Sequence, residues 1–251
     1  MTSSLAHLAS PDVAQLLAKV PVAVVPCGSV EQHGPHLPCG TDTIAATSVA
    51  QELATRLGAL YAEVGPYGIT PLHAGRPGTI SLGRRTFEML LRDVCGELVR
   101  MGAGTLVLVN WHEGNTASLN AVATDLQKKS TARVFIAQAC YVAERIYAGE
   151  GGALTHGGSI ETLAVMAHDP SLVHVERAAG RAQPEAAAAA DSMRRSPDVY
   201  GFVTDVSEIS EDGWYGDPTW ATTERSATFP TAVVDEILAR LRAIGALGDR
   251  S

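Results

Sequence analysis

Short apolar segments alternate with helical segments along this chain, and that alternation limits the folds it can adopt. Four runs of mostly apolar residues have the length of buried strands: residues 20–27, 60–64, 105–110 and 133–137. Segments with apolar residues at helical spacing lie between or after them, at residues 43–57, 86–101 and 118–128. The alternation predicts an α/β fold with a mostly parallel sheet covered by helices on both faces.

The rest of the chain adds helices and no obvious boundary. Residues 231–247 have the pattern of an amphipathic closing helix, and the alanine run 186–190 is typical of a surface helix. No stretch is rich enough in Gly, Ser and Pro to divide the chain, and no internal repeat is visible. We therefore expect one domain, residues 1–251.

Charge and composition exclude several classes of partner. The formal net charge is −8 and no block of Lys or Arg occurs, which argues against nucleic acid and anionic membrane as partners. No apolar stretch reaches the length of a membrane span, and the N-terminal residues do not resemble a signal peptide. The four cysteines have no zinc-type spacing, so we expect reduced thiols in a cytoplasmic protein.

The strongest candidate site directly follows the first strand-like run. Glu31, His33, His36 and Asp42 occur within twelve positions of a Gly- and Pro-rich loop. Each alone could be an ordinary loop residue, but carboxylates and imidazoles without Lys or Arg among them suit a divalent transition metal. His36 could instead orient a ligand through a hydrogen bond. The segment predicts metal-assisted hydrolysis.

Two further motifs offer ligands. His112 and Glu113 directly follow the strand-like run 105–110, and the carboxyl ends of parallel strands are where ligands bind in such sheets. Glu113 could face a metal or solvent. His156 precedes two glycines, and Glu161 falls in the first turn of a helix extending to about residue 168. Glu161 could be only a favourable N-terminal helix charge, but that leaves His156 unexplained.

Three loops are candidates for contacting substrate. The Gly- and Pro-rich segment 73–81 contains Thr79 and Ser81, although turn chemistry alone explains most of its composition. Trp214 and Tyr215 offer aromatic walls in a second loop, and Trp111 stands beside His112. We expect these five side chains to line a substrate pocket.

The ordered set of motifs resembles the creatininase (creatinine amidohydrolase) family over roughly residues 20–245. The most specific element is Glu-Gln-His-Gly-Pro-His-Leu-Pro at 31–38 with Thr41 and Asp42, followed in the family's order by Pro-Gly-Thr-Ile-Ser at 77–81 and the loops of His112 and His156. The resemblance implies a three-layer α/β/α sandwich with a two-metal site, in which zinc is the first expectation and manganese or iron the alternatives. It also implies a homo-oligomer, often a hexamer.

The resemblance also implies roles for individual residues. Glu31 and His112 would bind one metal, His33 the other, Asp42 would bridge both, and His156 would be the catalytic histidine. Creatininase has a glutamate two residues after the position of His112, where this chain has Gly114. We expect Glu161 to be the fifth ligand, with Glu113 as the reserve ligand or a catalytic group. The altered loop argues against creatinine as the substrate.

The functional hypothesis is a binuclear amidohydrolase that cleaves a C–N bond of a cyclic amide, formamide or related small molecule with a metal-activated hydroxide. His156 would stabilise the oxyanion or protonate the leaving nitrogen. A lactone or cyclic ketone hydrolase, or a peptidase, would use the same site. An inactive metal- or sugar-binding relative is the alternative from another class, and it is motivated by Gly114.

Overall fold

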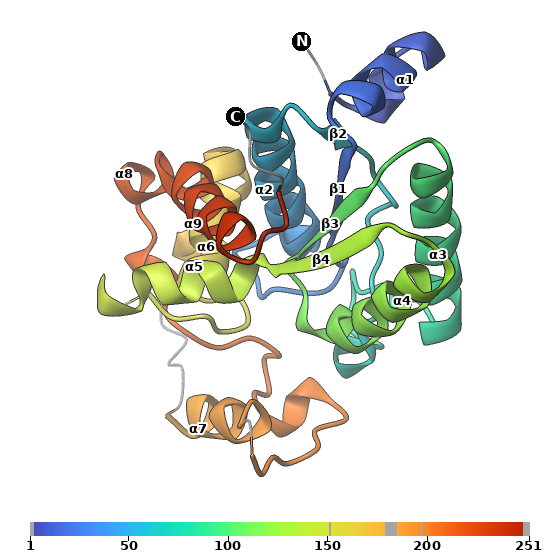
Figure 1. Cartoon of the computed structure of the whole chain (residues 1–251). Coiled ribbons are helices and arrows are strands. Elements are labelled where there is room, and N and C mark those ends of the chain that lie inside the picture. The colour runs from blue at the N-terminus through green and yellow to red at the C-terminus, as the bar shows by residue number, and fades with distance from the viewer. Residues whose placement is uncertain (1–2, 151, 179–184, 197, 248–251) are drawn as a thin grey trace.

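A parallel four-stranded sheet forms the centre of the molecule (Figure 1), with the strand order β2-β1-β3-β4. The structure is a computed structural model that describes residues 3–150, 152–178, 185–196 and 198–247. The strands are β1 (Val22–Cys27), β2 (Leu60–Tyr61), β3 (Thr105–Asn110) and β4 (Arg133–Gln138). All three neighbouring pairs are parallel, with Val24 opposite Val107 and Val107 opposite Phe135.

Helices cover both faces of this sheet, so the molecule has three layers. One face packs on α1 (Ser10–Lys19), α3 (Arg84–Arg100) and α4 (Thr116–Lys129). The other packs on α2 (Thr41–Leu57), α5 (Ala139–Tyr147), α6 (Ser159–His168) and α9 (Phe229–Ala243). The predicted α/β/α sandwich is confirmed, and its fold matches the resemblance.

Successive residues of the central strands belong to opposite cores because side chains alternate along a strand. In β3, Leu106 and Leu108 lie in the core beneath α3 and α4, whereas Val107 and Val109 lie in the core beneath α2 and α9. All four are fully buried. Burial on both faces explains why these strands are continuously apolar in the sequence.

The observed elements differ from the predicted ones mainly at their ends. The strand predicted at 60–64 is only two residues long as β2, which lies at the edge of the sheet and pairs with β1 through Leu60 and Tyr61 alone. The helix predicted from residue 43 begins at Thr41, which places Asp42 in the first turn of α2. Helices α1 and α5 were not predicted.

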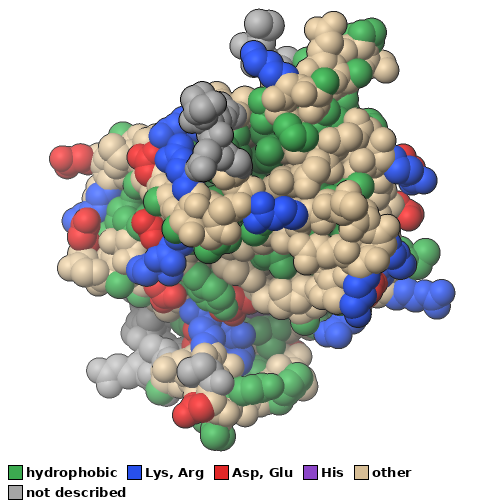
Figure 2. All heavy atoms as spheres, viewed as in Figure 1, with side chains coloured by type: hydrophobic (Ala, Val, Ile, Leu, Met, Phe, Trp, Pro, Cys, Tyr) green, Lys and Arg blue, Asp and Glu red, His purple; other side chains and the backbone are tan. Residues whose placement is uncertain are grey.

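The C-terminal third is less regular. Helix α7 (Glu185–Arg194) contains the alanine run, and it stands apart from the main body in a projection at the bottom of Figure 1. Figure 2 shows hydrophobic side chains on the surface of this projection. The short helix α8 (Thr223–Ser226) precedes α9. No helix in the described part of the chain is long and apolar enough to cross a membrane.

Candidate metal centre

The loop after β1 is fixed by backbone contacts that set the direction of its side chains. Glu31 N donates to Cys39 O at 2.9 Å, which closes the loop, and Ile80 N donates to Val30 O at 2.9 Å. Gly34 has a φ of +75°, and a Cβ there would lie 2.7 Å from the Trp214 ring. Glycine is therefore required at position 34 both for its conformation and for space.

Three carboxylates and four imidazoles are buried together at the carboxyl ends of β1 and β3. The group consists of Glu31, His33, Asp42, His73, His112, His156 and Glu161, none of them more than about a tenth exposed. The loop after β1 supplies two members, α2 and α6 supply one each, and the 3-10 helix η2 (Pro71–His73) and two loops supply the rest. The structure thus brings together every metal ligand that the resemblance implied.

One set of ligand atoms joins Glu31, Asp42 and His112. His112 Nδ1 lies 3.5 Å from Glu31 Oε1 and 3.0 Å from Asp42 Oδ2. Their ligand atoms all lie within 4.8 Å of one another, as a shared ion would require.

A second set joins His33, Asp42 and Glu161. His33 Nε2 lies 3.3 Å from Asp42 Oδ1 and 3.5 Å from Glu161 Oε2. These atoms also lie within 4.8 Å of one another. Asp42 therefore turns one carboxylate oxygen toward each set, the arrangement expected of a bridging ligand.

Backbone carbonyl groups orient both imidazoles. His33 Nδ1 bonds Glu31 O at 3.1 Å, and His112 Nε2 bonds Ile69 O at 2.9 Å. A ring nitrogen that bonds a carbonyl carries the proton, which leaves the other nitrogen free as a ligand. The free atoms are His33 Nε2 and His112 Nδ1, the two that face the carboxylates.

The electrostatics of the group favour cations. Burial raises the pKa of Glu31, and burial also raises the pKa of Glu161 to about 7. Burial opposes ionisation of Asp42 too, yet the charges of His33 and His112 hold its pKa well below the usual value. Burial opposes charge on His33, but Glu161 and Asp42 raise its pKa to about 10.

The donor set fits divalent metal ions. Among the described residues, the ion-pair partners of Glu31, Asp42 and Glu161 are all histidines. His33 Nε2 is buried with no hydrogen-bond partner in the part of the chain that the structure describes. Buried carboxylates without Lys or Arg beside them, and a buried imidazole nitrogen without a hydrogen bond, are unfavourable unless a metal satisfies them.

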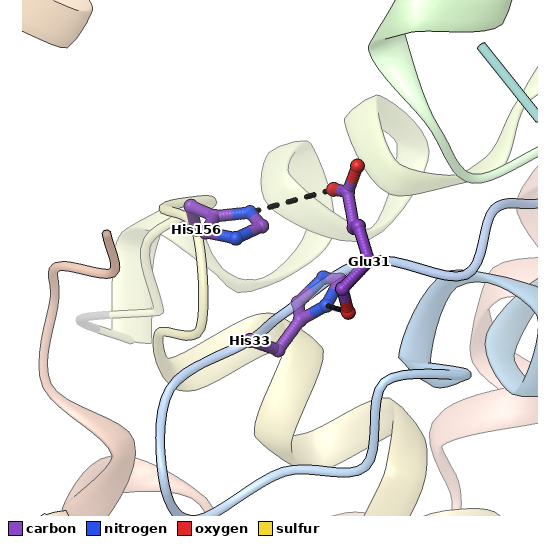
Figure 3. A group of neighbouring side chains, drawn as sticks. All are labelled: Glu31, His33 and His156. Atoms are coloured by element: carbon purple, nitrogen blue, oxygen red, sulfur yellow. Dashed lines mark hydrogen bonds and ion pairs between the residues drawn. The ribbon is translucent and has the colours of Figure 1, made fainter. Parts of the chain in front are cut away.

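His156 lies next to Glu31 and His33 of this group (Figure 3). Its Nδ1 points to Glu31 Oε1 at 3.7 Å, and its Nε2 bonds Gln32 O at 2.7 Å. Its ring lies 4.3 Å from that of His33. Burial holds the pKa of His156 well below the usual value. A neutral imidazole with one free nitrogen at the ligand group can accept or donate a proton there.

Glu113 lies apart from the two ligand sets and is held in an ionic cluster. Its carboxylate contacts Arg194 at 2.8 Å, Arg195 at 3.0 Å and the Tyr141 hydroxyl at 2.6 Å. Burial acts to raise the pKa of Glu113, but the two arginines outweigh burial, so its pKa lies below the usual value.

At Gly114, a Cβ would lie 2.2 Å from Ile69 O, so the backbone excludes a glutamate at that position.

A cavity of about 420 Å³ opens onto the ligand group. Trp111 and Tyr215 line it. Thr79 accepts a bond from Gln32 N at 3.0 Å and Ser81 accepts one from Thr70 N at 2.9 Å, so both support the site loops. Trp214 packs on His36, with ring centroids 4.7 Å apart. Contact of all five residues with substrate stays a prediction.

Some residues at the site were not singled out from the sequence. Ser29 donates to Asp42 Oδ2 at 2.7 Å, and Thr70 donates to Glu31 Oε2. His73 is buried with its ring 4.1 Å from that of His156, and burial lowers its pKa to about 3. Its only sequence signal was an imidazole at the start of the Gly- and Pro-rich loop. His36, which the sequence did single out, bonds Gly157 O at 2.7 Å.

Comparison with known proteins shows the family of this chain. The profile of the family described as creatinine amidohydrolase matches residues 6–241. The mycofactocin precursor peptide peptidase of Mycobacterium ulcerans (strain Agy99) is 34% identical over 94% of this chain and 91% of its own length. The creatinine amidohydrolase of Pseudomonas putida is 29% identical over 62% of this chain and 67% of its own.

Solved structures share the fold. A structure titled as manganese creatininase has a TM-score of 0.78 and 24% identity, covering 97% of this chain and 99% of its own. A Zn-Zn form of a creatininase mutant has a TM-score of 0.75 and 23% identity, covering 97% and 98%. The family profile spans nearly the whole chain, and the peptidase relative exceeds 30% identity over most of it. The chain therefore belongs to the creatininase family of hydrolases, which act on C–N bonds.

Proposed function

We propose that this protein is a binuclear metal-dependent amidohydrolase. The observation that carries the proposal is the placement of Asp42, whose Oδ1 faces His33 and whose Oδ2 faces His112. Glu31 and His112 would hold one ion and His33 and Glu161 the other, with Asp42 shared. The manganese and Zn-Zn forms of creatininase support these metals, and we expect zinc first, then manganese or iron.

The residues of the chain divide the work of amide hydrolysis. The two divalent ions that these residues would hold would supply an activated water and polarise the carbonyl group. Asp42 sets the spacing of the two ligand sets, and Thr70 and Ser29 hold the carboxylates by hydrogen bonds. Because His156 Nε2 is engaged with Gln32 O, the proton for the leaving nitrogen moves at Nδ1, which faces the site.

The substrate is an amide, and two kinds fit. A cyclic amide or formamide agrees with the small-molecule chemistry of the family profile. A peptide bond is the second candidate, because the relative with 34% identity is named a peptide peptidase and the cavity of about 420 Å³ has room for more than a small ring. A lactone or cyclic ketone would use the same groups, as a competing outcome of a substrate screen.

The first experiment measures metal content by mass spectrometry on protein purified without chelator. About two ions per chain are expected in the parent and almost none in Asp42→Ala, because both ligand sets lose their shared carboxylate. A panel of cyclic amides, formamides, short peptides and lactones then identifies the bond cleaved. A protein that takes up neither zinc, manganese nor iron would contradict the proposal and favour a binding protein without catalysis.

His156→Ala tests the proton transfer separately. Metal content should stay at the parent level, because His156 Nε2 is held by Gln32 and His156 belongs to neither of the two ligand sets that share Asp42, although one of its ring nitrogens also lies within 4.8 Å of ligand atoms of Glu31 and His33. The rate should fall at least about 10²-fold, as loss of a general acid typically causes. Near-parent turnover of the amide substrate would remove His156 from the mechanism.

The assembly state is a further part of the proposal. We expect a homo-oligomer, and a hexamer in line with the family resemblance. Light scattering on the purified protein measures the assembled mass, and a monomer at micromolar concentration would contradict the expectation.

A further inference from the structure

Gln32 contacts both of two stacked imidazoles, His73 and His156, and controls the hydrogen bonding of both. The rings of His73 and His156 are 4.1 Å apart and inclined by 25°. The backbone carbonyl of Gln32 bonds His156 Nε2 at 2.7 Å, and its side-chain nitrogen lies 3.0 Å from His73 Nδ1. One residue therefore sets which nitrogen of each ring carries a proton.

The orientation of the Gln32 carboxamide follows from two other contacts. Its Nε2 donates to Gly213 O, and its Oε1 accepts from Gly34 N at 3.1 Å. A rotated carboxamide would place oxygen against a carbonyl oxygen and NH₂ against an N–H, losing both bonds. The nitrogen therefore faces His73, and His73 Nδ1 must accept the hydrogen bond.

The two histidines consequently present opposite groups to the cavity. A neutral His73 that accepts at Nδ1 carries its proton at Nε2, whereas His156 carries its proton at Nε2 toward Gln32 O and keeps Nδ1 unprotonated. Gln32 Nε2 and His156 Nε2, which lie 3.2 Å apart, are then both donors, so this contact is not a hydrogen bond.

The Nε2–H group of His73 has no hydrogen-bond partner among the described residues. Its ion-pair partner is Glu31 Oε1 at 3.9 Å, which is beyond hydrogen-bond distance. His73 lines the cavity and is 4% exposed, so this donor stands at the edge of the ligand group with water largely excluded. A fixed donor that is shielded from bulk water is well placed to stabilise negative charge that develops on a substrate.

We infer that His73 is a catalytic residue, donating its Nε2–H to the carbonyl oxygen of the amide substrate while His156 handles the proton at Nδ1. This role rests on the proposed amide hydrolysis. The hydrogen bond becomes stronger as the carbonyl oxygen gains charge in the transition state, so its loss should lower kcat more than it raises KM.

Two variants separate the donor from its packing. His73→Phe keeps an aromatic ring against His156 but has no donor, whereas His73→Gln has a terminal NH₂ and cannot stack. With a donor role, His73→Phe should lose about 10²- to 10³-fold in kcat and His73→Gln should lose less. His7→Phe and His7→Gln, at an exposed position in η1 (Leu5–His7), serve as matched controls with unchanged kcat.

The reverse order, with His73→Phe equal to or faster than His73→Gln, would overturn the inference and assign His73 to packing. Both variants should retain parent metal content. If the parent protein binds metal but cleaves no substrate, the proposed function itself fails. The parent is assayed first, so this outcome is known before any variant is compared.

Nitrogen-15 NMR of the imidazoles tests the geometry without turnover. In the purified zinc-loaded protein, His73 should show a protonated Nε2 and an unprotonated Nδ1, with its signals assigned by their loss in His73→Phe. A protonated Nδ1 would direct the lone pair at the cavity and overturn the inference whatever the activity.

Discussion

At the scale of single residues, the chemistry depends on which atom of each side chain is left free. Backbone carbonyl groups bind one nitrogen of His33 and one of His112, so the remaining nitrogen of each faces the carboxylates. Asp42 differs from an ordinary surface aspartate because its two oxygens serve different neighbours. These constraints act within a few ångströms, so single substitutions should have selective effects.

Substitutions of Glu161 and Glu113 should differ in their effect on metal content. Glu161→Gln should reduce metal content from about two ions per chain to about one, because Glu161 Oε2 faces His33 Nε2 at 3.5 Å. Glu113→Gln should keep both ions, because its carboxylate lies against Arg194 and Arg195. Mass spectrometry of both variants measures this, and loss of an ion only in Glu113→Gln would exchange their roles.

A substitution at Gly114 should lower metal affinity through a steric effect on His112. Gly114→Ala would place a Cβ 2.5 Å from His112 Nε2 and 2.2 Å from Ile69 O, so it should displace His112 from its carbonyl partner. Metal affinity should fall about 10- to 100-fold, the usual effect of losing such an outer contact. Gly149→Ala is the matched control, since a Cβ there meets nothing within 4 Å. Competition with a chelator measures both, and equal affinities would contradict the steric argument.

At the scale of elements, α7 contributes to the site through the residues at its C-terminal end. Asp191 is buried and contacts Arg194 at 2.7 Å and Arg195 at 3.3 Å, and both arginines also contact Glu113. The chain that follows supplies Tyr200 and Phe202 to the cavity lining, although both are exposed. The ionic cluster thus fixes one wall of the cavity relative to the loop of His112.

Asp191→Ala should therefore affect stability and substrate binding more than chemistry. Two arginines would share one carboxylate, and removing one partner of a buried group costs about 1–3 kcal/mol of unfolding free energy. KM should rise while kcat changes little, because the metal ligands are untouched. Urea unfolding and steady-state kinetics measure the two effects. Asp198→Ala, at an exposed position, should change neither, and a selective fall in kcat for Asp191→Ala would contradict this view.

At the scale of the whole molecule, the ligand group joins segments that are distant in the chain. Residues 31–42, His112 and the segment 156–161 meet only when β1, β3 and α6 are packed together. Bound ions should therefore stabilise the folded state against an unfolded chain in which the ligands are scattered.

Chelation tests this coupling. At a free metal concentration a hundredfold above Kd, binding contributes about 2.7 kcal/mol, and a chain of this size gains about 2–4 °C in Tm per kcal/mol. Chelator should thus lower the Tm of the parent by at least about 5 °C. Asp42→Ala, which should hold no metal, is expected to melt at the same temperature with and without chelator; a parent Tm insensitive to chelation would separate metal binding from folding.

The sequence by itself determined the layers of the fold and the chemical types at the site. Apolar runs such as that of β3 have the length of a buried strand. Their alternation with helices predicts a parallel sheet. Glu31, His33 and Asp42 are close in the chain, so local spacing was enough to predict a metal site. The two-residue length of β2 could not be predicted in the same way, because it depends on how far this edge strand stays paired with β1.

Only the tertiary structure decided which distant groups face the ligand atoms. Glu161 and Glu113 have the same chemistry, and only packing turns the first toward His33 and the second toward two arginines. The approach of His73 to His156 likewise needs two loops more than eighty residues apart to meet around Gln32. Side-chain type is written in the sequence, but distances between remote segments arise from the packing of the whole chain.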